Sequence, residues 1–140
     1  MKKHTKIFVA TILTLVMCFS GLTAFASEEN GGISPRLSHM GSGAFSFVAG
    51  DQGGHVSVSY EGYSDSFMMA KVTLKLQKRF LLVFWNDVDE WSATNVELCG
   101  FFYHVFELDG KGTYRVKMTL EVAGNDGTID VIEDTRESTY

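Results

Sequence analysis

The sequence has 140 residues, with twelve Lys and Arg against seventeen Asp and Glu and a formal net charge of −5. This length predicts a single folded domain. The acidic balance and the lack of a basic patch exclude nucleic acid as a partner and make anionic surfaces poor ones.

The first 26 residues have the organisation of a secretory signal peptide. Three Lys residues within the first six precede an apolar run over residues 7–19, and Ala24 and Ala26 supply the small residues of a cleavage site. We therefore predict a signal peptide over residues 1–26 and a secreted protein that keeps no stable membrane anchor after cleavage. The alternatives are an uncleaved anchor helix over residues 7–26 and a lipoprotein modified at Cys18. Met17 disfavours the lipoprotein, because a small residue is required at that position.

Cleavage after Ala26 would remove three Lys residues, leaving nine basic against seventeen acidic residues and a net charge of −8. Cys99 would then be the single cysteine, so no disulfide could form within the mature chain. Cys99 is either buried or able to pair between chains, and its apolar neighbours Leu98, Phe101 and Phe102 favour burial.

Residues 27–43 are rich in Gly and contain Pro35, which predicts a flexible linker. Beyond it, apolar and polar residues alternate with a period of two, which indicates strands and not helices. The predicted strands cover residues 44–48, 55–60, 71–78, 80–85, 96–106, 113–122 and 128–133. About seven short strands at this spacing predict an all-β fold, an immunoglobulin-like antiparallel two-sheet sandwich over residues 44–136. Residues 137–140 are predicted to be a C-terminal tail.

Residues 108–116 have the pattern of the tyrosine corner found in immunoglobulin-type domains. In that motif a Tyr near the start of the sixth strand donates its hydroxyl hydrogen bond to upstream backbone. Tyr114 is the candidate Tyr here, and Val116 occupies the position of the second cysteine of antibody domains. An ordinary Gly-rich turn before a strand is the alternative.

The chain also resembles a group of small exported β-sandwich proteins of Gram-positive bacteria whose role is unassigned. The shared pieces are ISPR (residues 33–36), LQK (76–78), Trp85 with Trp91, and GTYRVK (112–117). The resemblance implies a secreted β-sandwich without catalysis and supplies no active-site residues. The chain departs from the group at residues 79–84, where such proteins place a polar Ser/Gly turn and this chain has mainly large apolar residues.

The apolar run over residues 80–85 supplies most of the candidate binding residues. The run is either an interior strand covered on both faces or an exposed hairpin tip, and the polar residues on both sides of it favour partial exposure. Trp85 and Trp91 could form a carbohydrate-stacking platform, although a core position for Trp85 and an edge position for Trp91 are favoured. The predicted binding residues are Phe80, Leu82, Phe84, Trp85 and Trp91.

The sequence offers little catalytic or metal-binding chemistry. Residues 126–130 and Glu133 match part of a helix-loop-helix calcium loop, but Val122 and Gly124 occupy the first and third ligand positions, so a hairpin turn is favoured. Cys99 and His104 could act together only if a bulge at Gly100 placed them on the same face of a strand. We therefore predict no catalytic residues, no metal ligands and no cofactor.

These patterns together predict a secreted, non-catalytic β-sandwich that acts by binding or as a surface or structural accessory. Its partner would be an unidentified protein or cell-surface component, and a homodimer is possible through the apolar run. The alternatives are a small secreted hydrolase, which would need a preorganised nucleophile and base, and a weak extracellular calcium-binding module.

Overall fold

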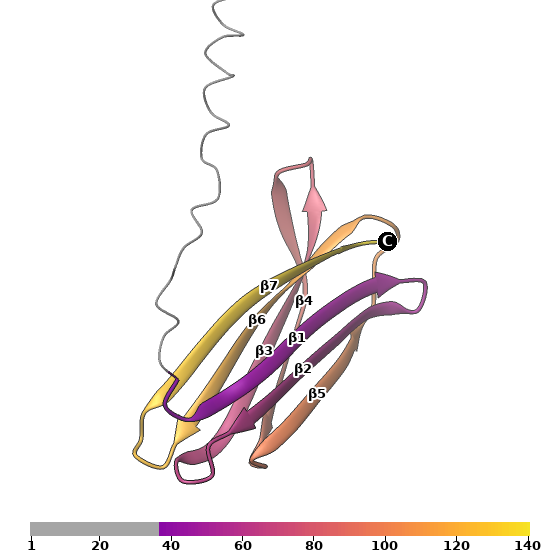
Figure 1. The fold of residues 1–140 in the computed structure, drawn as a ribbon. Coiled ribbons are helices and arrows are strands. Elements are labelled where there is room, and N and C mark those ends of the chain that lie inside the picture. Colours follow the sequence, from indigo (N-terminus) through magenta and orange to yellow (C-terminus); the bar gives the residue numbers. More distant parts are fainter. Residues whose placement is uncertain (1–36) are drawn as a thin grey trace, which may run out of the picture. The chain divides into compact units, whose positions relative to one another are not determined.

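Residues 37–140, the part of the chain that the computed structural model describes, form seven antiparallel strands and no helix (Figure 1). The strands are β1 (Met40–Gly50), β2 (Gly53–Gly62), β3 (Phe67–Phe80), β4 (Phe84–Asn95), β5 (Cys99–Phe106), β6 (Thr113–Gly124) and β7 (Ile129–Thr139). They build a three-stranded sheet of order β1-β2-β5 and a four-stranded sheet of order β4-β3-β6-β7. The predicted all-β class with seven strands in two antiparallel sheets is confirmed.

Two predictions concern residues outside this range. The signal peptide with its cleavage site lies within residues 1–26, and the first part of the linker predicted over residues 27–43 lies within residues 27–36; both are outside the described residues. Within residues 37–140, no helix has the length and apolarity needed to cross a membrane.

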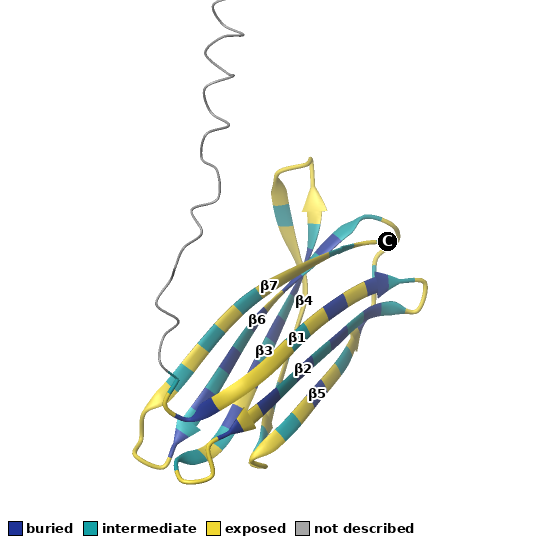
Figure 2. Cartoon of the chain, in the orientation of Figure 1, coloured by how far each residue is buried: buried dark blue, intermediate teal, exposed yellow. Residues whose placement is uncertain are grey.

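The core lies between the two sheets and follows the period-two alternation of the sequence. Every second side chain of β2 and β6 is buried, and Figure 2 shows this alternation along the strands. Val58 and Phe102 of the three-stranded sheet belong to the same buried cluster as Leu74, Tyr114 and Leu120 of the four-stranded sheet. Because each sheet buries its inner face against the other, neither sheet is expected to be stable alone.

The folded unit extends beyond the predicted bounds of 44–136 at both ends. It spans Leu37–Tyr140, with β1 beginning at Met40 and β7 ending at Thr139. His39 and Met40, which the sequence places in a linker, are only 1% and 5% exposed. The described end of the predicted linker and the whole of the predicted tail therefore belong to the folded unit.

The fourth strand differs from the prediction in position. The run predicted as a strand over residues 80–85 contains the end of β3, a turn at residues 81–83 and the start of β4. Beyond the Lys78–Tyr114 pair, β3 is paired with β4 alone, so the tip of this hairpin extends past the other strands (Figure 1). Strand β4 was not predicted because an edge strand can carry polar residues on most of its length, and it then lacks the alternation of apolar and polar residues.

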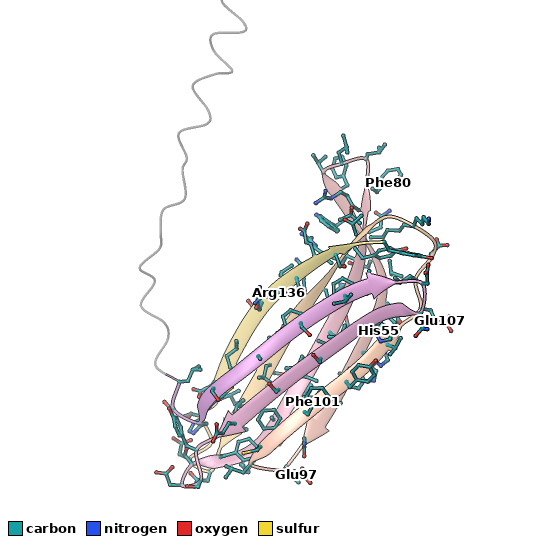
Figure 3. The ribbon with its side chains drawn as sticks, turned by 45° about the vertical axis from the view of Figure 1, so that its right-hand side comes forward. His55, Phe80, Glu97, Phe101, Glu107 and Arg136 are labelled. Atoms are coloured by element: carbon teal, nitrogen blue, oxygen red, sulfur yellow. The ribbon has the colours of Figure 1, made fainter. Side chains whose placement is uncertain are left out.

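The expectation that Cys99 is buried is wrong, because its side chain is exposed. Strand β5 buries Phe102 and Phe106, so its odd-numbered side chains point away from the core. Phe101, on the same outer face as Cys99, is 63% exposed (Figure 3). Apolar neighbours in sequence therefore do not bury a residue when they alternate between the two faces.

Tyr114, the second residue of β6, is fully buried, and its hydroxyl donates a hydrogen bond to the carbonyl oxygen of Gly110 at 2.7 Å. Gly110 has a φ of 68°, which a side chain would disfavour. The hydrogen bond predicted from the tyrosine-corner pattern is therefore present.

Candidate functional site

The β3–β4 hairpin brings together four of the five predicted binding residues. Phe80, Leu82 and Phe84 lie at its tip, and Trp85 lies one residue further along β4. Trp91 lies further along β4, where it packs against the core cluster. The candidate site is therefore the hairpin tip, defined as residues 80–84, together with the side chains at its base.

The tip side chains are well exposed, which confirms the exposed-tip alternative. Leu82 is 84% exposed, and its neighbours Leu81 and Val83 are 69% and 70% exposed. Figure 2 shows the tip of the β3–β4 hairpin in the colour of exposed residues. Phe80 and Phe84, the last pair of the β3–β4 ladder, are 51% and 62% exposed (Figure 3). Exposed apolar residues are common one at a time, but a continuous group of five is typical of an interaction surface.

The turn at the tip has an unfavourable backbone conformation. Leu81 and Leu82 have φ angles of 47° and 66°, in the left-handed region that favours Gly or Asn. The Val83 amide donates a hydrogen bond to the Leu81 carbonyl oxygen at 2.8 Å. The β6–β7 turn places Gly127 at its positive φ of 82° instead. The hairpin tip thus carries two large apolar side chains at positions where small residues would be more stable.

The two tryptophans do not form one platform. Residues six apart on a regular strand share a face. However, the pairing of β3 with β4 shifts between Leu76 and Gln77, which leaves Val88 as an extra residue in β4. This bulge places Trp85 on the outer face of the four-stranded sheet and Trp91 on its inner face. The expected core position of Trp85 is therefore wrong, and the edge position of Trp91 is right.

Trp85 sits against two guanidinium groups at the base of the tip. The Cζ atoms of Arg79 and Arg115 lie 4.9 and 4.1 Å from its ring centroid. Arg115 Nε donates a hydrogen bond of 2.7 Å to Gln77 Oε1, and Gln77 Nε2 donates one of 2.5 Å to Asp87 Oδ1. Gln77 is 8% exposed although it lies on the outer face, so this polar chain is packed and ordered. It holds the base of the tip in a defined geometry.

The charges at the base are largely paired. The hydrogen bonds from Gln77 and from Lys75 lower the pKa of the Asp87 carboxyl, and Asp87 in turn raises the pKa of Lys75. Lys75 Nζ lies 2.8 Å from Asp87 Oδ2, and Arg79 Nη2 lies 3.0 Å from Glu137 Oε2. The base therefore presents cationic side chains without a large net charge.

Trp91 stacks on His104 of β5, with ring centroids 4.6 Å apart and an interplanar angle of 12°. His104 also meets Phe106 edge-on at 4.5 Å. Burial lowers the pKa of His104, while the negative charge of Asp89 partly opposes this effect. The pair covers the core where β4 and β5, the edge strands of the two sheets, approach each other.

Cys99 and His104 are not arranged as a catalytic pair. The β2–β5 register runs without a shift from Gly54–Phe106 to Glu61–Cys99, so the bulge that the pair requires is absent from Gly100. The two residues are five positions apart, about 17 Å along a regular strand, and face opposite sides of the sheet. The thiol and the imidazole cannot exchange a proton directly in this geometry.

The residues of the partial calcium motif lie in the β6–β7 turn and in the first residues of β7. Asp126 Oδ1 accepts hydrogen bonds from the Thr128 amide at 2.9 Å and from the Thr128 hydroxyl at 2.8 Å, and these bonds lower the pKa of Asp126. Asp130 Oδ2 accepts a hydrogen bond from the His39 amide at 2.7 Å. Within residues 37–140, no group of three or more His, Cys, Asp or Glu is arranged to hold a metal ion. The Asp126 carboxylate therefore stabilises the turn, and the Asp130 carboxylate holds the backbone at His39 in place.

A cleft of about 350 Å³ lies between β1 and β7. Its charged groups are Asp134 and Arg136, which pair with each other at 2.8 Å. The rest of its lining is mainly apolar and includes Phe45, Met118 and Leu120. A paired carboxylate and guanidinium leave this cleft without a free general acid or base.

Sequence reasoning missed the residues that support the tip. Arg115 and Gln77 lie on different strands, and their link to Trp85 depends on the pairing of β3 with β6. The buried His39 was also missed, because its partners Thr128 and Asp130 are about ninety residues away. A long-range pairing of this kind leaves no local pattern in the sequence.

The site combines a projecting apolar tip with an ordered base of aromatic, amide and guanidinium groups. This arrangement can remove apolar surface from water on contact with a partner and can fix the orientation of that contact through Trp85 and its neighbours. Comparisons of the chain with family models, with curated proteins and with solved structures found no match.

Proposed function

We propose that this chain is an exported, non-catalytic protein that acts by binding through the tip of its β3–β4 hairpin. The observation that carries the proposal is the exposure of five consecutive apolar side chains, residues 80–84, on a turn with two left-handed leucines. Large exposed apolar groups of this kind are typical of interaction surfaces.

Backbone strain supports a functional reading of the tip. A left-handed Leu costs roughly 1–2 kcal/mol, and the Leu81–Leu82 turn contains two of them. Strain and exposed apolar surface both lower stability or solubility, so their coincidence at one turn favours a role that depends on these side chains. Loops on a rigid scaffold commonly carry binding residues in this way.

The scaffold is proposed to be an immunoglobulin-like sandwich. The sheet orders β1-β2-β5 and β4-β3-β6-β7 support this assignment, because such domains divide about seven strands between two sheets in a comparable way. The hydrogen bond from Tyr114 to Gly110 across the β5–β6 connection is a second supporting feature. A sandwich of this kind would hold the hairpin at one end as a rigid arm.

Export is proposed from the sequence of residues 1–26, which has the charge and apolar pattern of a signal peptide. An exported protein meets the outer surface of the cell that makes it and the material around that cell. A surface component is therefore the natural partner for the tip.

The proposal is tested by the binding of the mature protein to intact cells of its producer. The variant Leu82→Ser/Phe84→Ser removes two tip side chains, and Val48→Ser/Phe101→Ser is a matched control with similarly exposed side chains on the other sheet. We expect the wild type and the control to sediment with the cells and the tip variant to stay in solution. All three should keep the same thermal unfolding midpoint.

Equal sedimentation of all three proteins would contradict the proposal. Unfolding of the tip variant would also contradict it, because the tip would then belong to the core. In the first case the binding surface would lie elsewhere, and in the second the exposure of the tip would not describe the protein in solution.

A further inference from the structure

We propose that the β3–β4 tip inserts into the interfacial region of a phospholipid bilayer. This inference rests on the proposed function and names the partner of the same site. Residues 80–84 would enter the outer part of the acyl chains, while Arg79, Trp85 and Arg115 would lie at the level of the lipid headgroups.

The shape and chemistry of the tip favour lipid over a protein pocket. The tip is convex and apolar on both faces of the hairpin, because all five consecutive side chains, Phe80 to Phe84, are apolar and exposed. A protein pocket would have to enclose both faces, whereas acyl chains surround a projection without directional matching. The left-handed turn places Leu81 and Leu82 beyond the last β3–β4 pair, Phe80–Phe84, at the apex that would enter first.

The length of the apolar tip fits insertion to interfacial depth. The Phe80–Phe84 pair is followed by a turn of three residues, so the apex lies about two residues beyond Arg79 and Trp85 on each strand. At about 3.4 Å a residue this gives a depth of about 7–10 Å, close to the 5–10 Å reached by interfacial segments. The hydrogen bond from the Val83 amide to Leu81 reduces the number of backbone groups that would lose water.

The base of the tip has the composition of a membrane interface. Trp85 is partly exposed and lies against the guanidinium groups of Arg79 and Arg115. Tryptophan is enriched at the headgroup level, and long cationic side chains place their charge there while their stems cover apolar surface. The same three side chains would therefore limit the depth of insertion.

The charge pairing at the base determines the kind of bilayer expected. Arg79 is paired with Glu137, and Lys75 is paired with Asp87, so little net positive charge faces the membrane. The whole chain is acidic as well. Apolar insertion is then the main driving force, and binding should need neither anionic lipid nor low salt.

The inference is tested by flotation of the mature protein with vesicles of pure phosphatidylcholine and of pure phosphatidylglycerol. We expect the wild type and Val48→Ser/Phe101→Ser to float with phosphatidylcholine vesicles at low and at high salt. Leu82→Ser/Phe84→Ser should lose more than about tenfold in vesicle partition, because two apolar side chains no longer leave water. Leu82→Gly is a second variant that removes one tip side chain and favours the turn, and it should also lose vesicle partition while staying folded.

Depth is measured in a Trp91→Phe background, where Trp85 is the single tryptophan of the mature chain. Brominated phosphatidylcholine should quench Trp85 most strongly when the bromine atoms lie near the headgroups. Quenching that grows toward the bilayer centre would contradict the proposed depth.

Cell binding and vesicle flotation together distinguish a failure of the lipid inference from a failure of the proposed function. If the wild type binds cells through the tip but floats with neither vesicle, the lipid inference is wrong and a protein or carbohydrate partner is indicated. If sedimentation velocity shows a dimer that Leu82→Ser/Phe84→Ser abolishes, and no flotation occurs, the tip joins two copies of the chain. If the protein binds neither cells nor vesicles, both proposals fail.

Discussion

At the residue scale, Tyr114 links the β5–β6 connection to the core through one buried hydrogen bond. Tyr114→Phe removes the 2.7 Å bond to Gly110 and leaves a carbonyl without its partner. We expect the free energy of unfolding to fall by about 1 kcal/mol, measured by denaturant unfolding. Tyr63→Phe is the control, because Tyr63 is 45% exposed. Equal midpoints for wild type and Tyr114→Phe would show that the bond contributes nothing to stability.

His104 makes the stability of the fold sensitive to acid. Burial lowers its pKa below the ordinary value of 6.5, so the unfolded chain binds the proton more readily than the folded chain. The stability that the buried neutral imidazole of His104 contributes is fully present above about pH 6.5. It is lost as the pH falls from there through the lower pKa of the folded state. Thermal unfolding between pH 7 and pH 5 should show this loss of stability.

The matched variants for this prediction are His104→Phe and His55→Phe. His104→Phe keeps an aromatic ring between Trp91 and Phe106 but cannot take up a proton, so its unfolding midpoint should vary less with pH in this range. His55 lies on the outer face of β2, and its replacement should leave the acid sensitivity in place. The opposite pattern would assign the acid sensitivity to a different group.

At the element scale, the turn of the β3–β4 hairpin is less stable than it could be, because it carries large apolar residues at positive φ. Leu82 has a φ of 66°, which Gly adopts without steric cost. We expect Leu82→Gly to raise the free energy of unfolding by roughly 0.5–1 kcal/mol, after the greater flexibility of Gly in the unfolded chain is counted. Leu82→Ala is the control, because it removes most of the side chain but keeps the strained Cβ. Equal stability of the Gly and Ala variants would show that the turn is not strained.

At the scale of the whole molecule, the folded unit begins before the first predicted strand. A chain of residues 37–140 contains the whole of this compact unit, which starts at Leu37. A chain of residues 41–140 loses the buried His39 and Met40. We expect it to lose about 2 kcal/mol or more of its free energy of unfolding, as for other large truncations of buried side chains.

Differential scanning calorimetry of the two chains measures this boundary. If the chain of residues 41–140 is as stable as the chain of residues 37–140, residues 37–40 lie outside the cooperative unit. In that case the contacts of His39 with Thr128 and Asp130 would contribute nothing to the stability of the fold.

The sequence by itself determined the features that depend on local patterns. Period-two alternation in β2, β3 and β6 predicted strands because one face of each is buried, and the Gly-rich segment before Tyr114 predicted its hydrogen bond. The apolar run over residues 80–85 marked the candidate site as well. The run itself fits both of its possible structures, interior strand and exposed tip, and only the polar residues on both sides of it favoured exposure.

The tertiary structure alone decided which of these side chains meet water and which meet one another. The bulge at Val88 separates Trp85 from Trp91, and the alternation of β5 exposes Cys99 despite its apolar neighbours. His39 is buried because the β6–β7 turn, far away in sequence, supplies its hydrogen-bond partners. Burial and strand register depend on how strands far apart in the sequence pair with each other. The register that removes the most apolar surface from water is the stable one, even where the neighbours of a residue in the sequence suggest another environment for it.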